Sequence, residues 1–279
     1  MQYKITDNEF SLFQDYIEKN CGIHLENSKA YLIENRLRHL LFDYNCKTFV
    51  ELFNKIRSDK SNQLRDRIID SITTNETFWF RDIHPFTTLS EKLLPIFSND
   101  ISSGRKNKIR IWSAACSTGQ EPYSIVMSIL EYFKQNSSHY GSYFEIVASD
   151  ISESVLASAK SGIYDSLVIS RGLQTDIRDK YFSMDGNLWK VNDNIKKMVS
   201  FKKLNLQDSY NTLGKFDIVF CRNVLIYFSD LFKRDILKRI ADLLKPSGYL
   251  FIGSSESVSN YSNDYNMLSH KKTIYYQVK

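Results

Sequence analysis

Features that define several common protein classes are scarce or missing in this sequence. The four cysteines, Cys21, Cys46, Cys116 and Cys221, form no Cys-x-x-Cys pair, and no histidine spacing completes a zinc site. This pattern predicts buried thiols in a reducing compartment and no bound metal. No apolar run approaches about 18 residues, so no membrane insertion is expected. The first residues lack the basic-then-apolar pattern of a signal peptide, and we therefore expect a cytoplasmic protein.

Glycine is also scarce, and its placement divides the chain of 279 residues into two parts. Only one of the ten glycines, Gly22, precedes residue 104. Within residues 1–75, apolar residues recur in four segments at the spacing of amphipathic helices. We predict a four-helix domain over residues 1–75 and a linker over residues 76–90. The four apolar faces comprise Phe10, Phe13 and Ile17; Leu32, Ile33, Leu37, Leu40 and Leu41; Phe49, Leu52, Phe53 and Ile56; and Leu64, Ile68, Ile69 and Ile72.

A different pattern begins near residue 108. Short apolar runs alternate there with helical patterns, and the runs are IRIWSAA, FEIVASD, MVSFKKLNL, FDIVFCRN, YLFIGSSE and TIYYQV. This alternation predicts an α/β domain over residues 91–279, with a mainly parallel sheet whose ligands bind outside the carboxyl ends of the strands. The segment YFSMDGNLWKV interrupts the alternation, because Asp185-Gly186 between strand-like flanks is a strong hairpin signal. We predict a small antiparallel excursion at about residues 165–200.

Small and polar residues follow two of these runs. In WSAACSTGQEPYSI, residues 112–125, small side chains after a strand let a ligand approach the backbone, and we expect Pro122 at the first helical position. The single glycine of this loop, Gly119, matches neither the dinucleotide fingerprint nor the P-loop. Asp150 ends the next strand, where an acid is placed to accept hydrogen bonds from both hydroxyls of a ribose. The alternative is an aspartate that caps the following helix.

Two further segments combine polar and aromatic side chains. In FDIVFCRNVLIYF, residues 216–228, Arg222 and Asn223 follow an apolar strand and precede an expected helical run, a position that suits cofactor contact. A surface ion pair for Arg222 and ordinary amphipathic packing for Tyr227 are the alternatives. In TTNETFWFRD, residues 73–82, Asn75, Thr77 and Arg81 are separated by aromatic residues. The alternative there is a linker clamped by its aromatic side chains, with Arg81 in solvent.

In their order and spacing, these segments resemble the CheR family of chemotaxis receptor methyltransferases. The family pattern runs TN-x-T-x-F-F-R, W-S-A-x-C-S-T-G-x-E-P-Y-S-I, S/T-D-I, an Asn-Leu pair, F-D-x-I-F-C-R-N-V-x-I-Y-F and L-K-P-x-G-x-L-x-x-G-x-S-E. The sequence supplies Asn75, Thr77 and Arg81; Trp112 to Ile125; Asp150 and Ile151; Asn205 and Leu206; Phe216 to Phe228; and Leu244 to Glu256. It departs from the pattern at Trp79, Gln120 and Ser254. Because Glu121 is retained beside Gln120, we expect activity to survive.

The resemblance implies a Rossmann-like class I methyltransferase domain with a small antiparallel β subdomain, preceded by an all-α domain that recognises the receptor. The implied reaction transfers a methyl group from S-adenosylmethionine to glutamate carboxylates of chemoreceptors, giving glutamate methyl esters and S-adenosylhomocysteine. By resemblance, Arg81 and Tyr227 lie beside the transferred methyl as catalytic residues, and the linker contributes to the cofactor site. The implied cofactor contacts are Asn75, Thr77, Arg81, Glu121, Asp150, Asn205, Leu206, Arg222 and Asn223.

Recognition of the chemoreceptor is expected in the helical domain. Residues 1–75 carry 11 basic and 11 acidic residues, so an acidic partner must meet a local patch. The segment SKAYLIENRLRHLL is the best candidate because it supplies Lys29, Arg36 and Arg38, although Glu34 can pair with Arg38. The resemblance favours contact with the methylation-site helix of the receptor. In some family members the hairpin subdomain also captures a peptide at the receptor's C-terminus by strand addition.

Two other functions remain open from the sequence. A methyltransferase of the same fold that acts on nitrogen, in nucleic acid or in an amide, commonly carries Pro-Pro after the fourth strand. The four prolines of this chain include no adjacent pair, and we expect no nucleic-acid partner. The second alternative is a non-catalytic receptor-binding module that keeps the cofactor site for regulation.

Overall fold

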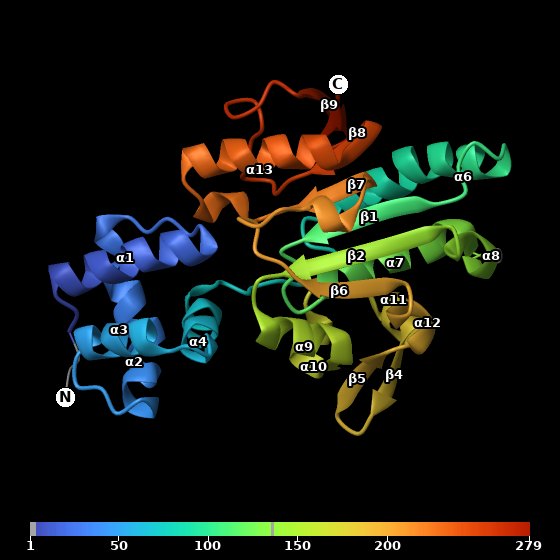
Figure 1. Ribbon diagram of the computed structural model, residues 1–279. Helices are drawn as coiled ribbons and strands as arrows, with labels where there is room; N and C mark the ends of the chain where they lie inside the picture. The colour runs from blue at the N-terminus through green and yellow to red at the C-terminus, as the bar shows by residue number, and fades with distance from the viewer. Residues whose placement is uncertain (1–3, 135–136) are drawn as a thin grey trace.

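An all-helical domain forms the N-terminal part of the molecule. The computed structural model describes residues 4–134 and 137–279. Within them, the first domain contains α1 Asp7–Cys21, α2 Ala30–Asp43, α3 Phe49–Ser58 and α4 Gln63–Ile72, and it lies beside a larger α/β domain (Figure 1). The predicted apolar faces meet in one core, in which Phe13, Ile33 and Leu37 are fully buried. The helical domain predicted from the sequence is confirmed.

Local signals define both ends of α1. Thr6 and Glu9 form a capping box, in which each side chain accepts a hydrogen bond from the backbone N–H of the other residue. Gly22 ends the helix in the left-handed conformation with φ 75°. A Cβ atom at this position would lie 2.3 Å from Cε1 of Phe232 in the α/β domain. Glycine therefore permits both the turn and the close approach of the two domains.

A seven-stranded sheet forms the centre of the second domain. The strand order is β6-β2-β1-β7-β8-β10-β9, in which the first five strands are parallel and β10 is antiparallel to β8 and β9. The direction of winding reverses at β1, which places the expected ligand crevice at the carboxyl ends of β1, β2 and β7. The strands are β1 Ile109–Ala114, β2 Phe144–Asp150, β6 Val199–Lys203, β7 Phe216–Cys221, β8 Leu244–Phe251, β9 Tyr265–His270 and β10 Thr273–Val278.

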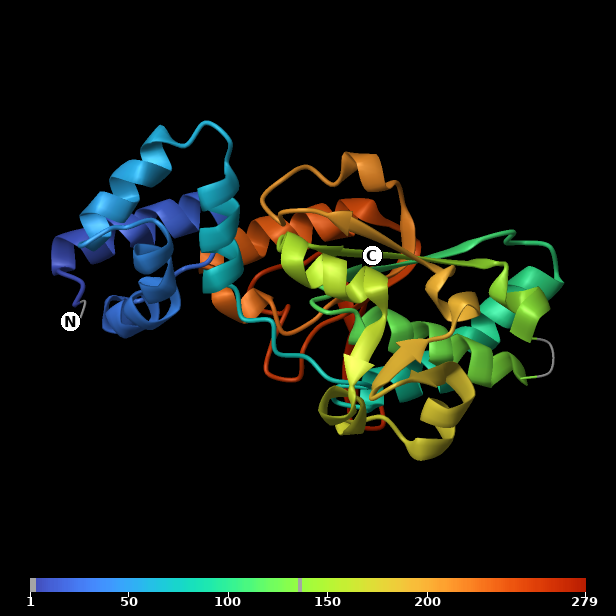
Figure 2. The ribbon, with the colours of Figure 1, turned by 90° about the horizontal axis from the view of Figure 1, so that it is seen from below.

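Helices cover both faces of this sheet (Figure 2). Successive side chains of a strand point to opposite faces, so Ile109 and Ile111 of β1 pack with α7, whereas Trp112 and Ala114 belong to the core that contains α13. No described helix is both long and apolar enough to cross a membrane. Beyond the helical domain the helices are α5 His84–Thr88, α6 Leu94–Ser102, α7 Gln120–Phe133, α8 Ser137–Gly141, α9 Glu153–Ser161, α10 Ser166–Ser170, α11 Thr175–Tyr181, α12 Asp193–Lys196 and α13 Asp230–Leu243, with a π-helical turn at Leu89–Leu93.

The predicted hairpin is part of a second, three-stranded antiparallel sheet. Strands β4 Phe182–Asp185 and β5 Leu188–Val191 pair around a two-residue turn, and β3 Ile163–Asp165 pairs with the other side of β5. The hairpin is confirmed, whereas β3 was not predicted because only three residues form it. Val191 is buried and Leu188 is exposed on the opposite face, as strand alternation requires.

Two expected helix starts differ from the structure. Helix α7 begins at Gln120, so Pro122 occupies its third position and not its first. A proline is tolerated there, because the first four N–H groups of a helix have no partner within it. The run after Asn223 forms only a short 3₁₀ turn at Leu225–Tyr227, and α13 begins at Asp230.

The loop after α1 joins the two domains. Ile23 forms a β-bridge with Phe228, and the N–H of His24 donates to the carbonyl of Tyr227 at 2.8 Å. The side chain of Asn205 donates to the carbonyl of Asn20 at 2.8 Å. These contacts bring the C-terminal end of α1 to the carboxyl edge of the central sheet.

Candidate functional site

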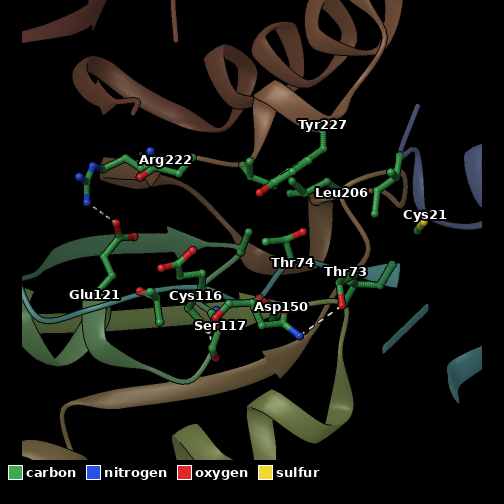
Figure 3. A pocket seen from close by; sticks show the side chains of 18 of the residues that line it. Cys21, Thr73, Thr74, Cys116, Ser117, Glu121, Asp150, Leu206, Arg222 and Tyr227 are labelled. Carbon is green, nitrogen blue, oxygen red and sulfur yellow. Dashed lines mark hydrogen bonds and ion pairs between the residues drawn. The ribbon is translucent and has the colours of Figure 1, made fainter. Parts of the chain in front are cut away.

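A cavity opens at the carboxyl edge of the sheet, between the two domains (Figure 3). Its empty space, counted with the open solvent at its mouth, is about 920 Å³. All residues for which the sequence predicted a cofactor or catalytic role line it, and they come from five separate segments of the sequence. They are Asn75, Thr77, Arg81, Glu121, Asp150, Asn205, Leu206, Arg222, Asn223 and Tyr227.

Asp150 lies at the end of β2, and its side chain is nearly fully buried. One carboxylate oxygen accepts from the N–H of Ser117 at 2.8 Å and the other from the N–H of Ser152 at 3.0 Å. Burial raises the pKa of the Asp150 carboxyl, and these hydrogen bonds oppose that shift. The helix-cap alternative does not hold, because Ser152 itself caps α9 by accepting from the N–H of Val155. Each carboxylate oxygen keeps lone pairs for ligand hydroxyls.

Glu121 and Arg222 form a buried ion pair at the other side of the cavity, drawn as a dashed line in Figure 3. Nη1 of Arg222 lies 2.8 Å from Glu121, and Nη2 lies 2.8 Å from the carboxylate of Asp82 and 2.7 Å from the carbonyl of Arg81. Glu121 also accepts a hydrogen bond from the hydroxyl of Ser113 at 2.7 Å. Arg222 therefore does not form a surface ion pair, because its side chain is only 1% exposed.

Residues 73–77 and Arg81 form part of the cavity wall, and arginine side chains hold this segment at two points. At its start, Arg36 donates to the carbonyls of Ile72 and Thr73 and to the hydroxyl of Thr74. At its end, Arg222 holds the carbonyl of Arg81. Asn75, Thr77 and Arg81 lie between these two anchors and line the cavity.

The backbone around Arg81 is strained. Phe80, Asp82 and Ile83 have positive φ values of 50°, 66° and 36°. For residues other than glycine this conformation costs about 1–3 kcal/mol each, so it persists only when surrounding contacts impose it. The N–H of Phe80 donates to the hydroxyl of Ser124 at 3.1 Å, which supplies one such contact in addition to Arg222.

Trp79, one of the departures from the family pattern, is completely buried. Its ring packs edge-on against Tyr164 and Phe182 at centroid distances of 5.0 and 5.1 Å. The aromatic residues of the linker therefore do clamp it, as the alternative interpretation proposed. Arg81 nevertheless lines the cavity. Its Nη1 donates to the carbonyl of Glu76 at 3.0 Å, and its guanidinium lies 5.6 Å from the centre of the Phe78 ring.

Glu256 supports the site from behind, a role that the sequence did not assign to it individually. One of its oxygens accepts from the N–H of Asn223 at 2.8 Å and from that of Gly253 at 2.6 Å, and the other accepts from the N–H of Ile226 at 3.3 Å. These bonds hold Asn223, whose φ is 56°, at the wall of the cavity. The only indication of this role in the sequence was that the motif from Leu244 to Glu256 ends in Ser255 and Glu256.

A methyl group at Gly253 should disturb this support. A Cβ atom there would lie 2.7 Å from both Asn223 Nδ2 and Glu256 Oε2, closer than such atoms approach. We expect Gly253→Ala to lower the free energy of unfolding by about 1–3 kcal/mol through overpacking and to weaken cofactor binding. Chemical denaturation and calorimetry measure the two effects. Gly141→Ala is the matched control, because its nearest neighbours lie at 3.5 Å or more, and equal behaviour of the two variants would contradict the assignment.

The helical domain contributes Cys21 and Ile23 to the cavity wall. Sequence reasoning missed both residues, because only the docking of the two domains brings the end of α1 to this edge of the sheet. Burial raises the pKa of the Cys21 thiol to about 11. The thiol therefore stays protonated at neutral pH and is an apolar part of the wall rather than a nucleophile.

Among the three predicted receptor contacts, Arg36 differs from Lys29 and Arg38 in its hydrogen bonding. Its guanidinium is engaged by the linker, a structural contact that the sequence gave no reason to expect. Lys29 and Arg38 are half-buried on the same segment. Glu34, the expected partner of Arg38, accepts a hydrogen bond from the N–H of Ile5 at 2.8 Å. Contact of Lys29, Arg36 and Arg38 with a receptor stays a prediction.

Two family descriptions together match nearly the whole chain. Residues 8–73 match "CheR methyltransferase, all-alpha domain", and residues 75–274 match "CheR methyltransferase, SAM binding domain". The chain belongs to the CheR methyltransferase family. It is therefore an S-adenosylmethionine-dependent methyltransferase, and the class I fold expected from the resemblance is the one observed.

Several CheR relatives are similar to this chain over almost their full length. The chain is 46% identical to "Chemotaxis protein methyltransferase 1" of Pseudomonas aeruginosa over 272 residues, which cover 97% of the chain and 98% of the relative. It is 45% identical to "Chemotaxis protein methyltransferase Cher2" of Pseudomonas putida, with the same coverage of both proteins. It is 43% identical to "Chemotaxis protein methyltransferase" of Vibrio parahaemolyticus over 277 residues, covering 99% of the chain and 98% of the relative.

The side chains around the cavity fit S-adenosylmethionine. Asp150 offers a buried carboxylate for ribose hydroxyls, and the small residues Ala115, Cys116 and Ser117 form the adjoining wall. Glu121 adds a second carboxylate, suited to the positive charge of an ammonium or sulfonium group.

Proposed function

We propose that this CheR methyltransferase converts glutamate side chains of chemoreceptors into methyl esters, as part of sensory adaptation in the cytoplasm. The observation that supports this function best is the convergence of Asp150, Arg81 and Tyr227 on one cavity. Asp150 would hold the ribose, and the further cofactor contacts would be Asn75, Thr77, Arg81, Glu121, Asn205, Leu206, Arg222 and Asn223. Arg81 and Tyr227 would act on the reacting groups.

The reaction needs no general base. A glutamate carboxyl has an ordinary pKa of about 4.3, so the nucleophile is already ionised at neutral pH. S-adenosylmethionine supplies the electrophilic methyl group when it is bound. Arg81 can orient the incoming carboxylate by charge-assisted hydrogen bonds, and the Tyr227 phenol can fix its other side. Catalysis then depends mainly on the placement of the carboxylate in line with the methyl group.

The function is tested by methyl transfer from radiolabelled S-adenosylmethionine to a purified receptor fragment. We expect label on glutamate that is released as methanol by mild base, because esters hydrolyse and N-methyl groups do not. Base-stable label would indicate a nitrogen acceptor instead. Cofactor binding without any transfer would indicate the non-catalytic module.

The proposed receptor contacts can be separated from the cofactor site. We expect Lys29→Glu and Arg38→Glu together to raise the KM for the receptor at least about fivefold at low salt, because each reversal replaces attraction by repulsion. Cofactor affinity should not change, since neither residue lines the cavity. Steady-state kinetics and calorimetry provide the measurements. Lys60→Glu, an exposed lysine between α3 and α4, is the control, and an equal KM for both variants would exclude this patch.

Arg36 needs a separate variant. Because Arg36 holds residues 72–74, which lead from α4 into the linker, Arg36→Glu should weaken cofactor binding as well as any receptor contact. A change in receptor KM alone would show that the linker contact is dispensable.

The hairpin supports a second proposed partner site, for a peptide at a receptor's C-terminus. The outer edges of the three-stranded sheet are β3 and β4, and strand addition to such an edge would tether the substrate. Tethering raises the effective concentration of the receptor without a new contact in the active site. The alternative is a hairpin that only covers the main domain.

Removing the hairpin distinguishes these two roles. We expect deletion of residues 183–190, closed by a short glycine linker, to leave turnover of an isolated methylation-site helix nearly unchanged. Methylation of a full-length receptor that carries the tail should fall at least about tenfold, because its effective concentration falls. Initial rates with both substrates give the comparison. Parallel loss on both substrates would mean that the hairpin is structural.

A further inference from the structure

Asp82 follows Arg81 in the chain and does not line the cavity. Its side chain is 30% exposed and lies 2.8 Å from Nη2 of Arg222. The same nitrogen donates to the carbonyl of Arg81 at 2.7 Å. One buried guanidinium group therefore holds two consecutive residues of the linker, one through its backbone and one through its side chain.

The backbone at this point does not adopt its conformation without help. Asp82 has φ 66° and its neighbour Ile83 has φ 36°, both in the region that non-glycine residues avoid. Ile83 is β-branched and about half exposed, so burial of its own side chain contributes little to fixing it. The N–H of Ile83 donates to the carbonyl of Phe80 at 2.7 Å within this turn. The contact with Arg222 adds a side-chain restraint from outside the turn, at Arg81 and Asp82.

Arg222 also has a partner that does not depend on Asp82. Nη1 binds Glu121 at 2.8 Å, and Glu121 is in turn held by Ser113. Loss of the Asp82 carboxylate therefore leaves the buried cation paired, and the fold should survive. The expected consequence is local, at the turn that contains Arg81.

We propose that Asp82 is a positioning residue for methyl transfer, which acts through Arg222 to hold the main chain of Arg81 in its reactive place. This inference rests on the proposed role of Arg81. Asp82 touches neither cofactor nor substrate in this scheme. Its contribution is to the orientation of the arginine that binds the incoming carboxylate.

The test compares Asp82→Ala, Asp82→Asn and Arg81→Ala with the unchanged protein. We expect Asp82→Ala to lower kcat between about tenfold and a hundredfold, the usual effect of a misplaced catalytic group. The dissociation constant for S-adenosylmethionine should change less than about threefold, because Glu121 keeps its partner and the other proposed cofactor contacts stay in place. Asp82→Asn retains an oxygen acceptor for Arg222 and should recover most of kcat.

A second readout does not depend on activity. Hydrogen exchange of the amides of residues 78–84 should become at least about tenfold faster in Asp82→Ala, because the strained turn opens more often. Glu91→Gln is the control, since it removes a carboxylate paired with Lys271 at a distance from the cavity. It should change neither kcat nor this exchange.

The possible failures are distinct. If Asp82→Ala keeps kcat within twofold or leaves the exchange unchanged, the positioning role is overturned. A parallel loss of cofactor affinity and kcat would mean a general structural role and would also overturn it. If Arg81→Ala keeps full kcat, the proposed role of Arg81 fails and this inference fails with it. Asp82→Ser, which also lacks the carboxylate, gives the same decision if Asp82→Ala does not fold.

Discussion

Replacement of Arg222 by methionine is expected to destabilise the protein strongly. The guanidinium is 1% exposed and lies between the carboxylates of Glu121 and Asp82. Its removal leaves two neighbouring acids without their cation, and breaking a buried ion pair from one side costs about 3–5 kcal/mol. S-adenosylmethionine should also bind more weakly, because Glu121 and the linker lose a shared anchor.

Chemical denaturation and calorimetry measure these two effects of Arg222→Met. Arg222→Lys is the variant to compare with it. Lysine keeps the positive charge but lacks the planar guanidinium that donates to both carboxylates. We expect it to recover part of the stability and little of the cofactor affinity. A loss below about 1 kcal/mol for Arg222→Met would mean that both acids reach solvent and that the pair is not a structural element.

Replacement of Asp150 by alanine should have the largest effect on the cofactor. Hydrogen bonds to a charged group contribute about 1.5–3 kcal/mol each, and about 1.4 kcal/mol corresponds to a factor of ten in affinity. If the carboxylate accepts from ribose hydroxyls, affinity for S-adenosylmethionine should fall at least about tenfold. Calorimetry gives the affinity, and circular dichroism shows whether the fold persists.

Asp150→Ala needs a control because Asp150 also forms hydrogen bonds within the protein. Asp150 also accepts from the N–H groups of Ser117 and Ser152, so a loss of affinity through a loosened loop must be separated from a lost ligand contact. Asp150→Asn keeps an oxygen acceptor and nearly the same volume, and it should retain more affinity than alanine does. Unchanged affinity in Asp150→Ala would remove Asp150 from the cofactor site.

Sequence reasoning predicted those parts of the molecule that depend on local patterns. Helical spacing indicated the N-terminal bundle, and alternating strands and helices indicated the α/β sheet. Asp185-Gly186 indicated the hairpin. The polar residues that follow apolar runs were expected at the carboxyl ends of strands, where a mainly parallel sheet binds its ligands.

What sequence reasoning missed depends on contacts between distant segments. Nothing in the sequence around Cys21 indicates that it lines a cavity, because that follows from the docking of α1 against Asn205. The clamp of Arg222 on Asp82 joins residues 140 positions apart. Arg36 was expected to face a receptor, and its bond to the linker at Thr74 likewise requires the folded arrangement. Pro122 was misplaced by two residues because the helix starts before it, at Gln120.

The shared wall of the cavity has a thermodynamic consequence. Cys21 and Ile23 belong to the helical domain, whereas Asp150 and Asn205 belong to the sheet domain, and a ligand in the cavity faces all of them. Coupling between two equilibria is reciprocal. If docking of the helical domain strengthens cofactor binding by a given free energy, the bound cofactor strengthens docking by the same amount. S-adenosylmethionine bound in this cavity would therefore also stabilise the docking of the domain proposed to recognise the receptor against the domain that carries out the chemistry. Transfer of the methyl group converts S-adenosylmethionine into S-adenosylhomocysteine. It changes the stability of domain docking only as far as these two ligands differ in their affinity for the docked protein.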